Sequence, residues 1–210
     1  MLRYLKAGEL GRYPKLADTM FADRASQFHA RLGWDVTVST EGQERDEYDA
    51  TDPVYVIWEG RDGAHQGSMR FLPTTGPTML ADHFRHLVPG TPIQSPYIWE
   101  TTRFCLTPGA PSRVSATLML GGLELGLAHG LSHAVAVFDA RMVRIYRQLG
   151  WPPAILGTTG TGREAISAGL WAFEPELRPM LARKARLSVE LSQFWIDRAL
   201  GRGAAGQLTG

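Results

Sequence analysis

The stretch YIWETTRFCL, residues 97–106, predicts a buried β-strand that carries two charges. Its aromatic, β-branched and aliphatic residues favour a strand inside a core. Glu100 and Arg103 interrupt this pattern. Removing either charge from water costs several kcal/mol unless it is paired or hydrogen-bonded, so buried charges are seldom accidental. The strand therefore needs either a structural or a catalytic explanation for both residues.

A neighbouring strand has the same feature. Residues 53–60 and 67–74 predict two strands joined by a turn at Asp62-Gly63, and Arg70 interrupts the second one. On a regular strand Glu100 points to one face and Arg103 to the other, but a β-bulge would bring both towards one cleft. The sequence leaves two explanations open: a buried ion pair of Glu100 with Arg70 or Arg103, or a functional site.

The remaining segments alternate between helical and strand patterns. We expect strands at 1–5, 132–139, 153–157 and 165–173, and helices at 10–31, 112–130, 140–150 and 175–200, with a short helical turn at 78–86. This alternation predicts an α/β sandwich in which helices cover a mixed sheet. The Gly-rich segment 157–162 lacks the Lys-Ser/Thr ending of a phosphate-binding loop, so we expect a hairpin connection there.

Composition indicates one ordinary globular domain. The chain has 210 residues, 44% of them hydrophobic and 20% charged, with a net charge of +1 and one cysteine. These values favour neither nucleic acid binding nor stable membrane association, and they are typical of a reducing compartment. The first residues carry no signal-peptide pattern and no apolar run reaches membrane-spanning length, so we expect a cytoplasmic protein. His83 and His86 lack the further ligands that a metal site needs, so no metal is expected.

A long polar segment, residues 31–52, follows the first predicted helix. It carries Trp34 near its start and Asp46, Glu47 and Asp49 near its end. A solvated acidic loop is the ordinary outcome of such a run. The same residues would also suit a ligand cation such as an ammonium or sulfonium, with aromatic faces from Trp34 and Phe28. The segment alone does not decide between the two.

Several of these residues occur in a recognisable order. The motifs are RLGW at 31–34, RDEYD at 45–49, SMRF at 68–71 and WETTRF at 99–104. Over residues 1–173 the pattern resembles that of the N-acyl-homoserine lactone synthases, the LuxI-type autoinducer synthases. The positions that match the family pattern are Arg24, Phe28, Trp34, Asp46, Asp49, Arg70, Glu100 and Arg103.

The resemblance implies a fold and a reaction. The fold would be an acetyltransferase-like (GNAT-like) α-β-α sandwich with a mixed, splayed central β-sheet. The enzyme would acylate the amine of S-adenosyl-L-methionine, used as a substrate, from a fatty acyl thioester and then form the lactone, releasing methylthioadenosine. The acyl donor would be acyl carrier protein or acyl-CoA, with no prosthetic group, and the resemblance leaves the oligomeric state open.

The resemblance also implies a division of the single domain, residues 1–210. Residues 1–52 would bind adenosylmethionine, residues 53–173 would form the sheet and the acyl pocket, 174–200 a C-terminal helix, and 201–210 a flexible tail. The adenosylmethionine site would comprise Arg24, Phe28, Trp34, Asp46, Asp49 and Arg70. Catalysis would use Glu100 as base or proton relay, with Arg103 and Thr102 beside it. A backbone N–H within 100–105 would stabilise the oxyanion.

Acyl selectivity is expected behind the sheet. The implied pocket residues are Ala136, Leu118, Gly122 and Phe104. Family members that use 3-oxo chains carry a threonine where this chain has Ala136, which favours an unsubstituted or 3-hydroxy chain. Gly121, Gly122 and Gly126 would leave room for a long tail.

Two basic clusters are candidates for carrier docking. Arg141, Arg144 and Arg147 recur on one predicted helix face, and a second cluster occupies residues 183–186. An ordinary solvated basic face is the alternative for each cluster. A rival function is an acetyl-CoA-dependent N-acetyltransferase of the same fold, but its phosphate-loop pattern matches only the terminal residues 198–203. A non-enzymatic acyl-binding module would leave the charges of the central strands unexplained.

Overall fold

A seven-stranded mixed sheet forms the centre of the computed structural model, which describes residues 1–202. The strand order is β1-β2-β3-β4-β5-β7-β6, and β4–β5 is the parallel pair. The strands are β1 (Leu2–Lys6), β2 (Val54–Glu59), β3 (His65–Pro73), β4 (Ile98–Leu106), β5 (His133–Asp139), β6 (Ala154–Thr159) and β7 (Ile166–Ala172). From residue 203 onward, the tail predicted to be flexible lies outside the described residues.

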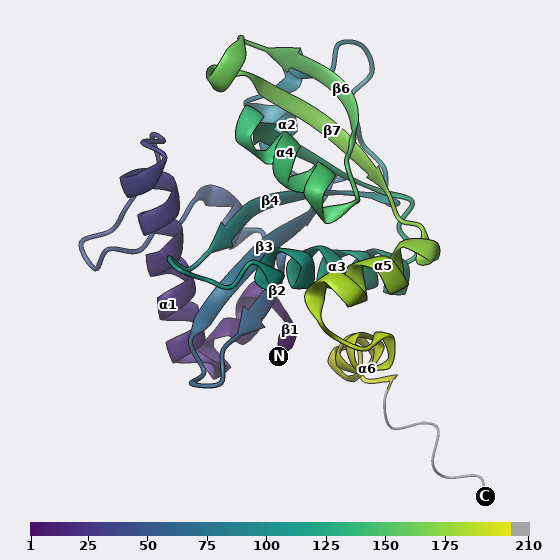
Figure 1. The fold of residues 1–210 in the computed structure, drawn as a ribbon. Coiled ribbons are helices and arrows are strands. Elements are labelled where there is room, and N and C mark those ends of the chain that lie inside the picture. Colours follow the sequence, from purple (N-terminus) through teal and green to yellow (C-terminus); the bar gives the residue numbers. More distant parts are fainter. Residues whose placement is uncertain (203–210) are drawn as a thin grey trace, which may run out of the picture.

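Helices cover both faces of this sheet (Figure 1). They are α1 (Pro14–Arg24), α2 (Met79–Asp82), α3 (Arg113–Ala128), α4 (Ala140–Leu149), α5 (Arg178–Ala185) and α6 (Val189–Ala199). The apolar clusters place α1 and α2 on one face and α3, α4 and α5 on the other. The expected α/β sandwich with a mixed sheet is confirmed.

The alternation of side chains along β2 shows why two helical layers are needed. Tyr55 and Ile57 are buried under α1, whereas Val56, between them, is buried under α3. A strand that is apolar on both faces must be covered on both faces. Burial of each such side chain contributes roughly 1.5–3 kcal/mol, so the central strands hold the two layers together.

The sheet opens between β4 and β5. Their register pairs only Ile98–Glu100 with residues 133–135, after which the two strands separate. On its other side, β4 has a bulge, because Thr102 faces Arg70 and Cys105 faces Ser68, leaving two β4 residues opposite one β3 residue. Arg103 lies in this bulge with a φ of 54°. The bulge that the sequence analysis considered is therefore present.

The end of α1 is linked to the sheet by a partly buried chain of hydrogen bonds. Asp23 contacts His65 Nδ1 at 2.6 Å, and His65 Nε2 lies 3.0 Å from Ser68 Oγ. Thr107 donates to the other carboxylate oxygen of Asp23 at 3.2 Å. Because Arg24 follows Asp23 on α1, these contacts also fix where the Arg24 side chain starts.

Two predicted helices differ from the structure. The first begins at Pro14, a favoured residue for an initial helical position, and continues beyond Arg24 as a π-helix over Ala25–Arg31. The second, predicted over 175–200, is divided into α5 and α6. Arg186 ends α5 in the left-handed conformation with a φ of 57°, and the Ser188 side chain caps α6.

Candidate functional site

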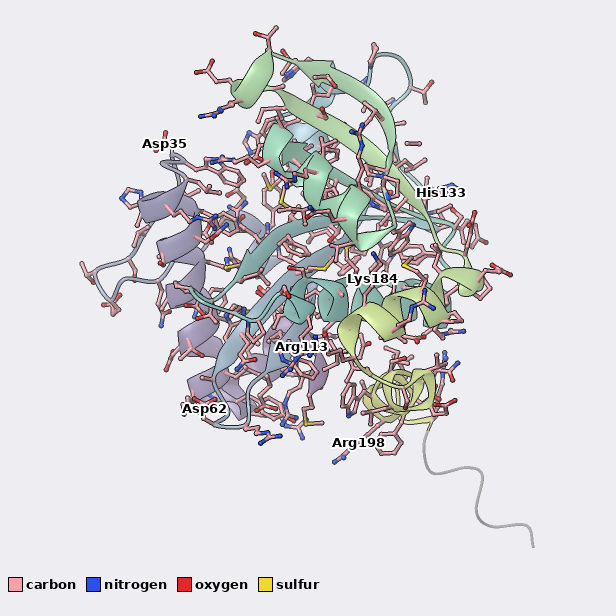
Figure 2. All side chains as sticks on the ribbon, in the orientation of Figure 1. Asp35, Asp62, Arg113, His133, Lys184 and Arg198 are labelled. Atoms are coloured by element: carbon pink, nitrogen blue, oxygen red, sulfur yellow. The ribbon has the colours of Figure 1, made fainter. Side chains whose placement is uncertain are left out.

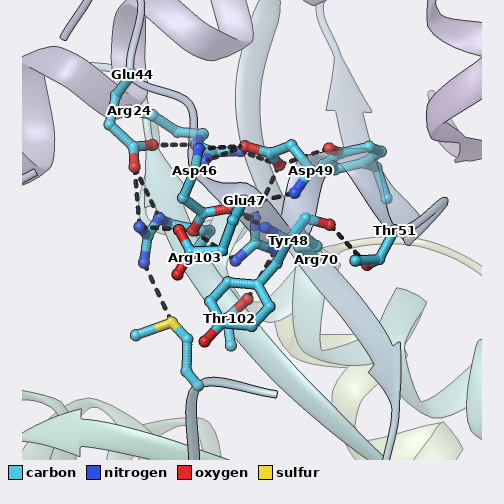
Figure 3. A network of polar contacts seen from close by, with 12 residues as sticks. Arg24, Glu44, Asp46, Glu47, Tyr48, Asp49, Thr51, Arg70, Thr102 and Arg103 are labelled. Carbon is cyan, nitrogen blue, oxygen red and sulfur yellow. Dashed lines mark hydrogen bonds and ion pairs between the residues drawn. The ribbon is translucent and has the colours of Figure 1, made fainter. Parts of the chain in front are cut away.

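A buried lattice of three guanidinium groups and three carboxylates joins α1, the segment after it, β3 and β4 (Figure 3). Its members are Arg24, Glu44, Asp46, Asp49, Arg70 and Arg103. Arg24 donates both terminal nitrogens to Asp49 at 2.9 Å each and its Nε to Glu44. Such bidentate pairs hold the two side chains in a fixed relative geometry and also pair their charges.

Arg70 and Arg103 complete the lattice from the sheet. Arg70 pairs with both oxygens of Asp46 and with Asp49, and it donates to Thr102 Oγ1 at 3.0 Å. The Arg103 guanidinium lies 2.9 Å from Glu44 and 2.8 Å from Asp46. The β4 bulge makes this convergence possible, because it turns Arg103 towards the side that Arg70 already occupies.

The lattice also orders the acidic segment. Asp46 accepts hydrogen bonds from the backbone N–H groups of Tyr48 and Asp49, which caps the short turn over Glu47–Ala50. Tyr55 donates its hydroxyl to Asp49 at 2.6 Å. Burial would raise the pKa of Asp49, but Arg24 and Arg70 hold that pKa well below its ordinary value. This part of the segment is therefore an ordered wall and not a solvated loop.

Glu44 belongs to this lattice although it is not among the residues predicted from the sequence. Its side chain is fully buried and bonded to both Arg24 and Arg103. Seven acidic residues lie between positions 31 and 52, and no spacing rule separates Glu44 from the solvated ones. Three of these residues, Asp46, Glu47 and Asp49, were already available as partners for the arginines, so the sequence carried no signal for Glu44.

A single cavity of about 650 Å³ runs from the end of α1 through the opening in the sheet to the space above α3. Its polar end includes Phe28, Trp34, Glu44, Asp46, Glu47 and Tyr48. Thr101, Thr102, Arg103 and Phe104 line its middle. Its apolar end includes Met69, Phe71, Met119, Gly122, Ala134, Ala136, Phe138, Tyr146, Trp151, Trp171 and Phe173. A continuous cavity with two chemically different ends can hold two different substrates.

The polar end combines aromatic faces with carboxylates, of which Asp46 is paired with Arg70 and Arg103. The rings of Phe28 and Trp34 stack with centroids 5.1 Å apart and planes at 11°. The Arg103 guanidinium lies 5.4 Å from the centre of the Phe28 ring. Carboxylates of Asp46 and Glu47 line the same end. Aromatic rings with nearby carboxylates suit a cationic ligand.

The implied residues divide between the cavity and its supports. Phe28, Trp34, Asp46, Thr102 and Arg103 line the cavity. The remaining members of the implied adenosylmethionine site, Arg24, Asp49 and Arg70, lie behind its wall and contact the lining residues Glu44, Asp46 and Thr102.

The implied acyl-pocket residues divide in the same way. Ala136, Gly122 and Phe104 line the apolar end. Leu118 does not, because it is fully buried against β3, where it lies close to Gly67. Leu118 is therefore part of the packing between α3 and the sheet and not of the cavity wall.

Glu100 is fully buried but does not line the cavity. Its carboxylate accepts the backbone N–H groups of Met79 at 2.9 Å and Leu80 at 2.7 Å, which are the first residues of α2. Burial raises its pKa to about 7, against the lowering effect of these two hydrogen bonds and of Arg70. Among the described residues Glu100 has no ion-pair partner, so the ion-pair alternative does not apply to it.

Basic side chains gather beside the cavity. Arg141 lines it and pairs with Asp139, whereas Arg144 and Arg147 are exposed on α4. A separate groove is lined by Pro111, Ser112, Arg113, Ala116, Gln148, Leu149, Lys184 and Arg186. Figure 2 labels Arg113 and Lys184, two of its three cations. The groove therefore joins the start of α3 to the second predicted basic cluster.

The chain is similar to known proteins over most of its length. The autoinducer synthase family matches residues 10–178. An acyl-homoserine-lactone synthase of Rhizobium etli is 41% identical over 202 residues, which cover 92% of this chain and 95% of that protein. No helix among residues 1–202 is long and apolar enough to cross a membrane.

Solved structures agree with this result. A CoA-dependent acyl-homoserine lactone synthase, MesI, superposes with a TM-score of 0.78 at 26% identity, covering 90% of this chain and 96% of that one. A second CoA-dependent synthase, BjaI, solved with S-adenosylmethionine and isopentyl-CoA, gives the same TM-score at 25% identity, covering 90% and 91%. The implied acetyltransferase-like fold is confirmed.

Proposed function

The chain belongs to the autoinducer synthase family and is an acyl-homoserine-lactone synthase, and on that premise we propose how its cavity divides the reaction. S-adenosyl-L-methionine occupies the polar end, and the fatty chain of an acyl thioester occupies the apolar end. The observation that carries this proposal is the single cavity with an aromatic, acidic end and an aliphatic, aromatic end. The opening between β4 and β5 is where the two substrates meet.

In the first step the amine of adenosylmethionine attacks the thioester carbonyl. A C–N bond forms, the C–S bond breaks, the amine loses a proton and the carrier leaves as its thiol. The oxyanion formed on the way needs a fixed donor. A backbone N–H of the β4 bulge, at Arg103 or Phe104, supports this role, because the bulge leaves one residue without a ladder partner and both residues line the cavity.

Glu100 has a different role in this proposal from that of a base in contact with the amine. Both of its oxygens bind backbone N–H groups of α2, and it does not reach the cavity. Met79 and His83, on and next to α2, line the polar end. Glu100 therefore positions this wall, and a role as proton relay would require a water between its carboxylate and the amine.

In the second step a carboxylate oxygen of the methionyl part attacks its own γ-carbon. The bond from that carbon to the sulfonium sulfur breaks, and methylthioadenosine leaves as a neutral molecule. Because the leaving group carries away no charge, orientation and exclusion of water are the main requirements. The stacked Phe28 and Trp34 side chains support this by enclosing the polar end.

The acyl donor is an unsubstituted or 3-hydroxy chain in this proposal, since Ala136 lines the apolar end without offering a hydroxyl to a 3-oxo group. Coenzyme A is the favoured carrier, because two similar solved synthases are described as CoA-dependent. Acyl carrier protein is the alternative donor. The reaction would take place in the cytoplasm, consistent with a single, buried cysteine.

The test is to incubate the protein with methyl-labelled S-adenosylmethionine and octanoyl- to hexadecanoyl-CoA. We expect labelled methylthioadenosine and an acyl-homoserine lactone in equal amounts. Acylation without methylthioadenosine would instead indicate an N-acyltransferase. An Asp46→Asn variant should raise KM for adenosylmethionine more than KM for the thioester. If adenosylmethionine is not consumed with any thioester, including those on acyl carrier protein, the proposal is wrong.

A further inference from the structure

We propose that Gly122 sets the longest acyl chain that the enzyme accepts, because it keeps open the part of the apolar cavity that lies beyond Met119. The inference rests on the proposed function and goes further by naming a residue that determines specificity. Three glycines lie in the middle of α3, Gly121, Gly122 and Gly126, and the sequence alone does not distinguish their roles. Each costs helix stability relative to alanine, so each needs a reason.

Two of these glycines have a packing explanation. A Cβ at Gly121 would lie 2.6 Å from Val56 and 3.0 Å from Leu2, so the absence of a side chain lets α3 approach the sheet. A Cβ at Gly126 would lie 2.4 Å from the ring of Phe173. Gly121 and Gly126 do not line the cavity. They are needed for helix contact and leave no room for a ligand.

Gly122 differs because it lines the cavity. A Cβ there would lie 3.2 Å from Phe71 Cζ and 3.5 Å from Met69 Cε, and both of these side chains line the same space. A methyl group would need only a small shift of the Phe71 ring. A branched side chain would have to fill the cavity or push Phe71 into it.

The position of Gly122 along α3 explains why chain length is affected. Met119 precedes it by about one turn, on the half of α3 that packs near Leu106, where β4 has already separated from β5. Gly126 follows it by about one turn, against Phe173. Four residues of helix span about 6 Å, which is the length of several methylene groups. Beyond this point Trp151 and Phe173 close the end with ring centroids 5.9 Å apart. A side chain at 122 would therefore remove the deepest part of the cavity.

Short chains should not be affected. They would end before Gly122, near Met119 and Ala136, where the wall is unchanged. A pocket discriminates one methylene group by roughly 10- to 200-fold. We therefore expect Gly122→Val to lower the ratio of kcat/KM for hexadecanoyl over octanoyl donor at least tenfold. Gly122→Ala should lower the same ratio by a smaller factor.

The experiment measures lactone products from an equimolar mixture of octanoyl to hexadecanoyl donors, using the full chain. Gly121→Ala is the matched control, since it disturbs α3 packing next to the same residue without facing the cavity. It should lower Tm and leave the product profile unchanged. Because Phe71 is the nearest neighbour of the added methyl, Phe71→Leu in the Gly122→Ala background should restore the longer products.

The outcomes separate this inference from the proposed function. If the unaltered protein makes no lactone, the proposed function fails. If it makes lactone and a folded Gly122→Val keeps the parental preference, the inference about Gly122 is overturned and the function stands. Should Gly122→Val not fold, the Gly122→Ala variant and its Phe71→Leu partner decide, and an unchanged profile in both overturns the inference.

Discussion

At the scale of single residues, Arg103 combines a strained backbone conformation with a side chain that belongs to the site. Its φ of 54° lies in the left-handed region, which costs a non-glycine residue roughly 1–3 kcal/mol. The guanidinium is held by Glu44 and Asp46, and it also lies 3.3 Å from Met79 Sδ. Removing one partner of a buried charge pair costs roughly 3–5 kcal/mol, so the lattice is strong enough to keep this conformation.

The raised pKa of Glu100 predicts a pH-dependent stability. Its ordinary value of 4.5 rises to about 7 in the folded protein, so between these values the unfolded chain loses this proton while the folded chain keeps it. The stability contributed by this group is therefore complete below about pH 4.5 and falls by about 3 kcal/mol as the pH rises through 7. We expect Glu100→Gln to flatten this dependence, measured as the free energy of unfolding in urea at pH 5 and pH 8.

The comparison of pH 5 with pH 8 needs no separate correction for Asp49. That carboxylate has a depressed pKa, and its contribution is lost only at more acidic pH, in both proteins alike. Equal pH dependence in the two proteins would show that Glu100 is already ionised in the folded state at pH 5.

If Glu100 acts by positioning α2, the loss of another contact of α2 should cause the same kinetic defect. Tyr48 donates its hydroxyl to Asp82 of α2 at 2.9 Å, so Tyr48→Phe removes this contact while the ring stays in the cavity wall. Both Tyr48→Phe and Glu100→Gln should raise KM for adenosylmethionine severalfold, more than they lower kcat. Steady-state kinetics over pH 6–9 would measure this. A Glu100→Gln variant with normal KM and a kcat reduced a hundredfold would instead identify Glu100 as the base.

At the scale of elements, the periodicity of the sequence predicted nearly every strand and helix but not how the helices end. The break between α5 and α6 was missed because the residue in left-handed conformation is Arg186, where a glycine would have been recognisable. The π-helical continuation of α1 was predicted as ordinary helix, because seven residues are too few for i→i+5 spacing to show in the sequence. Both features depend on contacts beyond the segment itself.

The left-handed backbone conformation of Arg186 leads us to predict that a glycine there would stabilise the protein. Arg186→Gly removes the steric cost of a side chain at a φ of 57°, and we expect a gain of roughly 1 kcal/mol in the free energy of unfolding. Thermal or urea unfolding would measure it. Arg183→Gly is the control, because Arg183 lies inside α5 with helical geometry. This variant should lose a similar amount of stability. A loss of stability in Arg186→Gly would mean that the side chain makes contacts worth more than the strain.

At the scale of the whole molecule, the sandwich followed from alternating patterns, whereas the site required distances that no pattern contains. The sequence pointed to Arg70, Glu100 and Arg103 because charges in apolar strands are rare. It did not show that Glu100 would face α2, since that depends on how the segment between β3 and β4, which contains α2, returns to the sheet. Strand opening and bulge position are likewise tertiary properties.

The basic groove leads to a prediction about how strongly the enzyme prefers charged acyl donors. Arg113, Lys184 and Arg186 line it, and Ala116 and Leu149 in its wall lie about one helical turn from Met119 and Ile145 of the cavity. A phosphorylated or acidic carrier would therefore rest on these cations while its acyl chain enters the cavity. We expect Arg113→Glu with Lys184→Glu to lower kcat/KM for acyl-CoA at least tenfold at low salt, and less at 0.5 M salt because the charges are screened.

A donor without phosphate groups tests whether the effect of these substitutions comes from charge. An acyl thioester of N-acetylcysteamine has no phosphate, so the charge-reversed variant should use it as well as the parent does. Arg198→Glu, an exposed arginine on α6 (Figure 2), is the matched control and should leave both donors unaffected. Repeating the assay with acyl carrier protein compares the two carriers on the same surface. An equal loss with the uncharged thioester would show that the substitutions damage the cavity, and the groove would then have no part in donor binding.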